Sequence, residues 1–204
     1  MNKTIKGLPL YLVFAILANI FYYVFLIPAA FLYPGYSPFL YTVSALGNTE
    51  KNPNGWFLFS ISLILIGIVL VPYFFDMKKW YESQSKLKKY VIAIQILGYF
   101  NSFSLVMIAI FPTNTASPLH NFWSLMNFFC IELIILLVII GLRKHPSYWK
   151  RISIVGAVDF AICATYLTLL RVYRAIATIF EWLTFIFALA IILLIALNMY
   201  NKGL

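Results

Sequence analysis

The feature that most constrains this chain is a series of long apolar runs separated by short connectors. A helix of about 20 residues crosses the roughly 30 Å hydrocarbon layer of a membrane. A soluble protein could not bury so much apolar surface, since 63% of the 204 residues are hydrophobic and only 10% are charged. We therefore predict an all-α integral membrane protein, with residues 1–204 forming one domain of six transmembrane helices. The expected spans lie at about 8–32, 56–75, 90–111, 122–142, 152–170 and 175–197.

The first run follows Lys3 and Lys6, a pattern that signal peptides share. The apolar core of a signal peptide is usually about 7–15 residues long, and this run is longer. We interpret it as a retained first span.

The basic residues indicate the orientation of the chain. Twelve of the fifteen Lys and Arg residues lie near the termini or in the 76–89 and 143–151 connectors. Because cytoplasmic connectors carry the excess of Lys and Arg, both termini are expected in the cytoplasm of a multi-pass cell-membrane protein. The other face keeps only Lys51, Arg171 and Arg174. This distribution favours lipid headgroups as partners and gives no nucleic-acid patch.

Acidic residues inside the predicted spans are the first candidates for function, because an ionised carboxylate near mid-bilayer costs several kcal/mol. At a rise of ~1.5 Å per residue, Glu132 and Asp159 lie ~15 Å and ~17 Å below the outer surface, on consecutive antiparallel helices. Asn19 and Asn101 come out at a similar level, which predicts a mid-membrane polar layer. No Lys or Arg shares this depth, so at least one carboxyl is expected to hold a proton. A proton or cation site and an interhelical hydrogen-bond cluster both fit this pattern.

Glu181 is expected nearer the outer surface. Arg174, Thr178 and Glu181 follow the i, i+4, i+7 spacing of one helix face, and Arg171 is close in sequence. A structural salt bridge is the favoured interpretation. The alternative is that Arg171 and Arg174 hold an anionic headgroup, since the planar guanidinium suits phosphate.

Two short motifs stand on the predicted outer face: "SALGN" at residues 44–48 and "FPTN…LHN" at residues 111–121. This pairing resembles the membrane family called domain of unknown function 998, with its S-x-LG element after the first span and F-P followed by His after the third. A more distant likeness reaches the damage-regulated autophagy modulators and the GPI-lipid-remodelling membrane proteins, and implies lipid handling at the outer leaflet. Thr113 and Asn114 stand where the family often has an acid, which puts acid-dependent chemistry in doubt. The positions carried over are Ser44, Leu46, Gly47, Phe111, Pro112 and His120.

His120 is the single candidate for a catalytic residue, because imidazole titrates near neutral pH. A hydrogen bond that pins the two outer loops together is the favoured role, since a lone His without a positioned partner is weak evidence of catalysis. The other histidine, His145, is expected across the membrane, and a catalytic zinc wants three protein ligands, so no metal is predicted. Haem, flavin and nucleotide motifs are absent from the sequence, so no cofactor is expected. Cys130 and Cys163 are interpreted as apolar fillers inside spans.

The favoured function is the binding or handling of a membrane lipid in the outer half of the bilayer. His120 is then expected close to the 44–48 segment, at a cavity. A small proton- or cation-coupled transporter that uses Glu132 and Asp159 is one alternative. A non-catalytic scaffold whose outer loops bind a partner protein is the other. The predicted ligand-binding residues are Ser44, Gly47, Asn48, His120, Arg171, Arg174 and Glu181.

Overall fold

The computed structural model describes residues 4–5 and 7–204, without the side chains of Thr4, Ile5, Arg171, Arg174 and Ala175. Within this part of the chain, six helices are long and apolar enough to cross a membrane, as the sequence predicted. The long helices are α1 (Leu10–Leu32), α2 (Trp56–Asp76), α4 (Lys88–Ile110), α5 (Ser117–Ile140), α6 (Lys150–Val172) and α7 (Arg174–Asn201). Short elements fill the connectors: η1 (Ser44–Gly47), α3 (Lys79–Ser83), η2 (Ser85–Leu87) and η3 (Leu142–Lys144).

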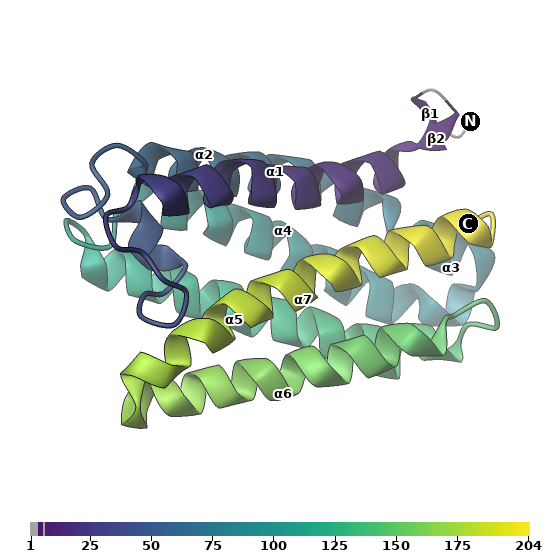
Figure 1. The fold of residues 1–204 in the computed structure, drawn as a ribbon. Coiled ribbons are helices and arrows are strands. Elements are labelled where there is room, and N and C mark those ends of the chain that lie inside the picture. The colour runs from purple at the N-terminus through teal and green to yellow at the C-terminus, as the bar shows by residue number, and fades with distance from the viewer. Residues whose placement is uncertain (1–3, 6) are drawn as a thin grey trace.

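The helices run up and down along one bundle (Figure 1). The hydroxyl of Tyr11, early in α1, donates a hydrogen bond to the carbonyl of Leu204 (3.1 Å), so the start of α1 and the C-terminus lie together. We call this the terminal end of the bundle; the 77–87 and 141–149 connectors lie there too. The 33–55 and 111–116 connectors and the α6–α7 junction lie at the opposite end, the loop end (Figure 1).

Two local features differ from the sequence expectation. A two-residue antiparallel pair, β1 (Thr4–Ile5) with β2 (Leu8–Pro9), precedes α1. Gly7 lies in its turn at φ 81°, a conformation that L side chains rarely adopt. In addition, α5 begins at Ser117, ahead of the expected start near 122, because a proline near the first helical position is compatible with a helix start. His120, which was expected in a connector, therefore lies in the first turn of α5.

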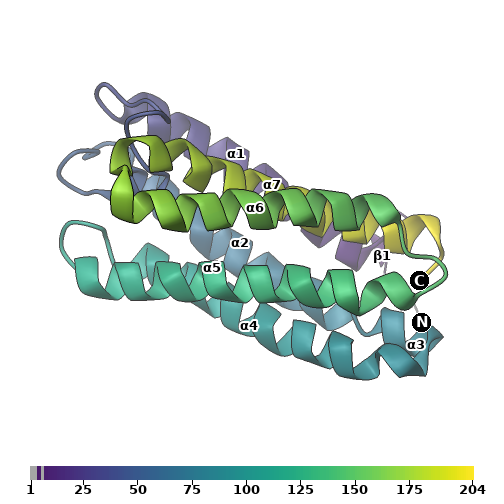
Figure 2. The ribbon, with the colours of Figure 1, turned by 90° about the horizontal axis from the view of Figure 1, so that it is seen from below.

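The core lies between α1, α2, α4, α5 and α7, and includes large side chains that are almost fully buried, among them Tyr22, Tyr73, Phe74 and Trp80. By contrast, α6 is the least buried of the six long helices. It runs along α7 on one side and α5 on the other, at the margin of the bundle (Figure 2). The α5–α6 seam is therefore the place where side chains of the bundle interior come close to the surrounding lipid.

Candidate functional site

The 33–55 connector folds back into the loop end of the bundle. Val43 and Leu46 are 1% and 0% exposed, so the segment around η1 is part of the core. Oε2 of Glu181, on α7, accepts a hydrogen bond from the backbone N–H of Val43 at 2.8 Å. The amide and hydroxyl of Ser44 face the same carboxyl. Glu181 therefore fixes the connector to α7 by binding free N–H groups at the start of η1.

An aromatic contact reinforces this anchor. The indole N–H of Trp182 donates to the hydroxyl of Tyr36 (2.8 Å), and that hydroxyl donates to the carbonyl of Thr42 (2.9 Å). Burial raises the pKa of Tyr36 above its usual range, so the phenol stays neutral and able to donate. The side chains of Arg171 and Arg174 lie outside the described residues, so the predicted salt bridge and headgroup contact stay predictions.

Gly47 and Asn48 of the motif have structural roles. A Cβ on Gly47 would come within 2.6 Å of the Phe59 ring, so only glycine allows η1 to pack this closely on α2. The side-chain oxygen of Asn48 accepts the N–H groups of Glu50 (3.0 Å) and Lys51 (2.8 Å), as in an Asx turn.

The two connectors at the loop end are joined by Asn114 and Thr49. The side-chain oxygen of Asn114 accepts the Thr49 N–H at 3.1 Å, and its amide nitrogen donates to the Thr49 hydroxyl at 2.9 Å. His120 bonds within its own hairpin: Nδ1 donates to the carbonyl of Phe111 at 2.7 Å. The ring is 2% exposed, and Nε2 has no hydrogen-bond partner among the described residues. The loop-to-loop contact therefore belongs to Asn114.

Two small cavities continue from this anchor into the bundle. The outer one, about 10 Å³, is bordered by Ser44, Ser124, Asn127 and Glu181, and His120 is not among its lining residues. A water molecule needs roughly 10–15 Å³ of such space, whereas ligand pockets measure about 300–1,000 Å³. This place has room for about one water and none for a lipid headgroup.

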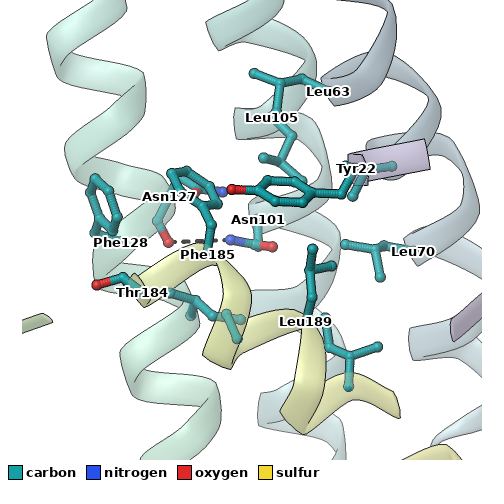
Figure 3. A pocket seen from close by; sticks show the side chains of 14 residues that line it. Tyr22, Leu63, Leu70, Asn101, Leu105, Asn127, Phe128, Thr184, Phe185 and Leu189 are labelled. Atoms are coloured by element: carbon teal, nitrogen blue, oxygen red, sulfur yellow. Dashed lines mark hydrogen bonds between the residues drawn. The ribbon is translucent and has the colours of Figure 1, made fainter. Parts of the chain in front are cut away.

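The inner cavity, about 40 Å³, also borders on Asn127 and reaches Tyr22, Asn101 and Thr184 (Figure 3). Tyr22 is 1% exposed, and its hydroxyl has no hydrogen-bond partner among the described residues. Figure 3 shows this hydroxyl pointing across the cavity toward Asn127. At roughly 10–15 Å³ per water, the cavity has room for a few ordered waters that could bond these groups.

The four residues of the predicted mid-membrane layer do not form one hydrogen-bonded network in the described part of the chain. The Asn19 amide donates to the carbonyls of Ala15 (2.9 Å) and Leu189 (3.3 Å), which joins α1 to α7. The Asn101 amide donates to the carbonyl of Asn127 (3.2 Å), which joins α4 to α5. Both asparagines pair with backbone groups of neighbouring helices, so the carboxyls remain apart from them.

Glu132 on α5 and Asp159 on α6 lie close enough for their charges to interact. Asp159 is 0% exposed and Glu132 is partly buried. Neither carboxyl has a well-formed hydrogen bond within the described residues, although the thiol of Cys163 lies beside Glu132. A buried polar group without a partner costs about 1–3 kcal/mol, and more when it is charged. These carboxyls therefore need a proton, water or a ligand.

A crevice of about 220 Å³ runs along the α5–α6 seam beside this pair. Its walls are apolar except for Glu132, and they follow one face of each helix. Leu125 and Phe129 are 51% and 56% exposed, so the crevice opens sideways, where lipid surrounds a membrane helix. The wall residues are Leu125, Phe128, Phe129 and Glu132 of α5, and Phe160, Cys163, Ala164 and Leu167 of α6.

Sequence reasoning missed several of these residues. Cys163 was interpreted as a filler, yet it lines the crevice beside Glu132. The i, i+4, i+7 spacing of Leu125, Phe129 and Glu132 could have indicated a shared face. Asn127 is a polar residue inside an apolar run, which could have indicated a polar position in the bundle interior; it borders both small cavities.

The described residues contain no group of three or more His, Cys, Asp or Glu side chains placed to hold a metal ion. A family model described as "Protein of unknown function (DUF998)" matches residues 16–198. The chain belongs to the DUF998 family. In this DUF998 protein, the S-x-LG motif forms the η1 anchor, and the His of the F-P…His motif closes the α4–α5 turn. No curated protein and no solved structure gives a match.

Proposed function

We propose that this DUF998 protein binds a lipophilic molecule that enters the α5–α6 crevice sideways from the membrane. The observation that carries the proposal is the carboxyl of Glu132, which has only the weakly donating thiol of Cys163 beside it although it stands in an otherwise apolar, lipid-facing crevice. Small-molecule sites commonly combine apolar walls with a few placed polar groups. The crevice is smaller than a full ligand pocket, so part of the molecule stays among the lipid chains.

The polar group of the ligand follows from the two carboxyls. A carboxylate only accepts hydrogen bonds, and two buried carboxyls near one another favour a positive charge in their surroundings. The sequence offers no Lys or Arg anywhere in α5, and none in α6 between Arg151 and Arg171. A lipophilic amine therefore fits best: its ammonium group meets Glu132, with the buried Asp159 behind it, and its chain lies along Phe129 and Ala164.

The position of the crevice supports binding in the outer half of the bilayer. From Glu132, its walls continue to Leu125 on α5 and Leu167 on α6, toward the loop end. The distribution of Lys and Arg favours the loop end as the outer face. This differs from the predicted site between the loops, where the described cavities are only large enough for water. A headgroup role for Arg171 and Arg174 stays a prediction.

The test is photolabelling of the protein in lipid vesicles with an alkylamine that carries a diazirine on its chain. Labelled peptides should come from α5 and α6. Ala164→Phe fills the crevice and should abolish labelling. Ala161→Phe is the matched control, because Ala161 is exposed on α6 but is not among the crevice-lining residues. Equal labelling of both variants would show that no ligand enters here.

The second arm tests the carboxyls. Glu132→Gln should weaken labelling by the amine, while a diazirine alcohol of equal chain length should label the variant and the wild type alike. The same loss for both probes would point to a collapsed crevice and would contradict the role of the charge.

A proton- or cation-coupled transporter is the second candidate, favoured by the closeness of Glu132 and Asp159 and by the absence of a well-formed hydrogen bond to either carboxyl among the described residues. Transport predicts pH-dependent flux in reconstituted vesicles that both Glu132→Gln and Asp159→Asn abolish. Flux that persists in both variants would remove this candidate. If the wild-type protein shows no flux but is labelled by the amine, the crevice binds the amine without transporting protons or cations.

A further inference from the structure

The terminal end of the α5–α6 seam holds a separate groove of about 620 Å³. It lies between the connector that follows α5 and the first turn of α6. Its lining combines the basic residues Arg143 and Lys150 with Tyr148, Ser153 and Ile154. The α5–α6 crevice is almost entirely apolar. This groove instead combines positive charge, hydroxyl groups and the exposed aliphatic side chain of Ile154.

The 141–149 connector and the first turn of α6 carry four basic side chains, and two of them are already engaged by aromatic residues. The ammonium of Lys144 donates to the hydroxyl of Tyr90 (2.8 Å) and lies 4.7 Å from the centre of its ring. The guanidinium of Arg151 stacks over the ring of Trp149 at 3.7 Å. These contacts hold both charges away from the groove.

The other two, Arg143 and Lys150, line the groove. Both side chains are exposed. The only ion pair found among the described residues joins Lys78 to Glu82, on the neighbouring connector. The structure also gives Arg143 and Lys150 no hydrogen bond within the described residues, so both positive charges are available to a ligand.

The wall of the groove adds hydroxyl groups. The hydroxyls of Tyr148 and Ser153 lie 3.0 Å apart, and either can be the donor of their mutual hydrogen bond. Burial raises the pKa of Tyr148, so both groups keep their protons. Since two hydroxyls share one hydrogen bond, one O–H remains to donate to a further acceptor. Ile154, next along α6, is 66% exposed and continues the groove toward the lipid chains.

We propose that this groove binds the phosphate group of an anionic phospholipid. The planar guanidinium of Arg143 and the ammonium of Lys150 suit a phosphate. The free hydroxyl of the Tyr148–Ser153 pair can donate to one of its oxygens, and Ile154 can contact the first methylenes of an acyl chain. Basic pockets between transmembrane helices at the cytoplasmic surface are suited to anionic headgroups. The Lys- and Arg-rich connectors favour the cytoplasmic surface for the terminal end.

The experiment measures thermal unfolding of the whole protein in detergent, with added phosphatidylglycerol, phosphatidylcholine or inorganic phosphate. A ligand that binds only the folded state stabilises it by RT ln(1 + [L]/Kd), so the midpoint rises with the ligand concentration relative to Kd. Wild-type protein should be stabilised by phosphatidylglycerol over phosphatidylcholine. Arg143→Gln/Lys150→Gln should bind phosphatidylglycerol roughly tenfold more weakly. The control variant Lys144→Gln/Arg151→Gln also removes two positive charges from residues 143–151, but not from the groove, and should keep the preference for phosphatidylglycerol.

A conservative exchange, Arg143→Lys/Lys150→Arg, keeps both charges and should also retain the preference, which separates lost binding from misfolding. Stabilisation by phosphatidylglycerol alone identifies a lipid phosphate as the ligand. Equal stabilisation by inorganic phosphate supports the anion site but assigns it to a free phosphate. A Gln double variant that prefers phosphatidylglycerol as strongly as wild type overturns the proposal. The phospholipid measurements do not depend on the outcome of amine labelling in the α5–α6 crevice.

Discussion

Glu181 and the Glu132–Asp159 pair show two different ways in which one bundle buries carboxyls. Glu181 is 3% exposed and accepts the Val43 N–H, so its oxygens bind a backbone that would otherwise lack partners. Asp159 is 0% exposed and has no hydrogen-bond partner among the described residues, and Glu132 has only the thiol of Cys163 beside it. Burial alone therefore does not separate a structural acid from one available to a ligand; the partners of its oxygens do.

The packing around Glu181 and around Glu132 differs in the same way. Around Glu181, the connector, α2 and α7 pack so closely that the nearby cavity holds about 10 Å³. Beside Glu132, α6 is the least buried long helix, and a crevice of about 220 Å³ lies between it and α5. The satisfied acid Glu181 lies where packing is tight, whereas Glu132 lies where a second molecule has room to enter. The comparison predicts opposite effects of mutation at the two places.

The largest effect is expected at Glu181. Glu181→Ala removes the acceptor of the Val43 N–H and leaves that buried donor without a partner, which should cost about 2–3 kcal/mol of stability. Thermal unfolding in detergent measures the loss. Limited proteolysis should also cut the 33–55 connector faster. Glu181→Gln keeps an acceptor oxygen and should lose clearly less. An Ala variant as stable as wild type would show that Glu181 does not anchor the connector.

Replacing Asp159, the buried acid beside the crevice, should change stability in the opposite direction. Asp159→Leu removes a buried carboxyl without a described partner and should leave stability unchanged or raise it by about 1–2 kcal/mol. Amine labelling should fall in the same variant. Asn101→Leu is the control, because it breaks the bond to the Asn127 carbonyl on α5 and should destabilise. Strong destabilisation by Asp159→Leu would mean that this acid, like Glu181, is structural.

The sequence predicts the helices well, because a span depends on a local property, the length of an apolar run. The start of α5 differed because Ser117–His120 is too polar to count as hydrocarbon-spanning, yet Pro118 is compatible with the first turn of a helix. The depth argument placed Glu132 and Asp159 on adjacent helices, and the structure brings the two carboxyls near enough for a charge on one to act on the other.

The candidate site was harder to predict, because it depends on which side chain each connector brings to which helix. The spacing of Arg174 and Glu181 on one helix face gives no sign that the carboxyl binds the Val43 amide, distant in the sequence. For the same reason, Asn19 and Asn101 share a depth with the acids but bond to backbone carbonyls. Depth along a helix is readable from sequence, whereas rotation about its axis depends on packing.

A smaller effect tests whether Glu181 is the only anchor of the loop end. Asn114→Ala removes every side-chain bond from this residue to Thr49 and should cost about 1 kcal/mol, because this contact is only partly buried. Asn121→Ala is the control, since Asn121 is exposed and bonds only weakly to Ser117 (3.4 Å). Thermal midpoints compare the two. Equal midpoints would assign the position of the connector to Glu181 alone.

The smallest expected effect concerns His145, a titratable group at the terminal end whose nitrogens both have partners, like the oxygens of Glu181. Nδ1 accepts the N–H of Ser147 (3.0 Å), so Nε2 carries the proton and donates to the hydroxyl of Ser83 (3.0 Å). The Ser83 hydroxyl in turn donates to the carbonyl of Trp80 (3.0 Å). Protonation of Nδ1 would remove the acceptor of Ser147, so the folded state requires the neutral ring.

Burial accordingly lowers the pKa of His145 below its ordinary 6.5 in the folded protein. The unfolded chain then binds the proton more readily, so stability is complete above about pH 6.5, falls as the pH drops below it, and levels off below the folded pKa. Thermal midpoints between about pH 7.5 and about pH 5.5 should fall further for wild type than for His145→Asn. The Asn oxygen can accept the Ser147 N–H without titrating, so the difference between the two curves isolates the imidazole from the carboxyls. Parallel curves would show that His145 tolerates protonation, and that the partners of its nitrogens do not determine its charge.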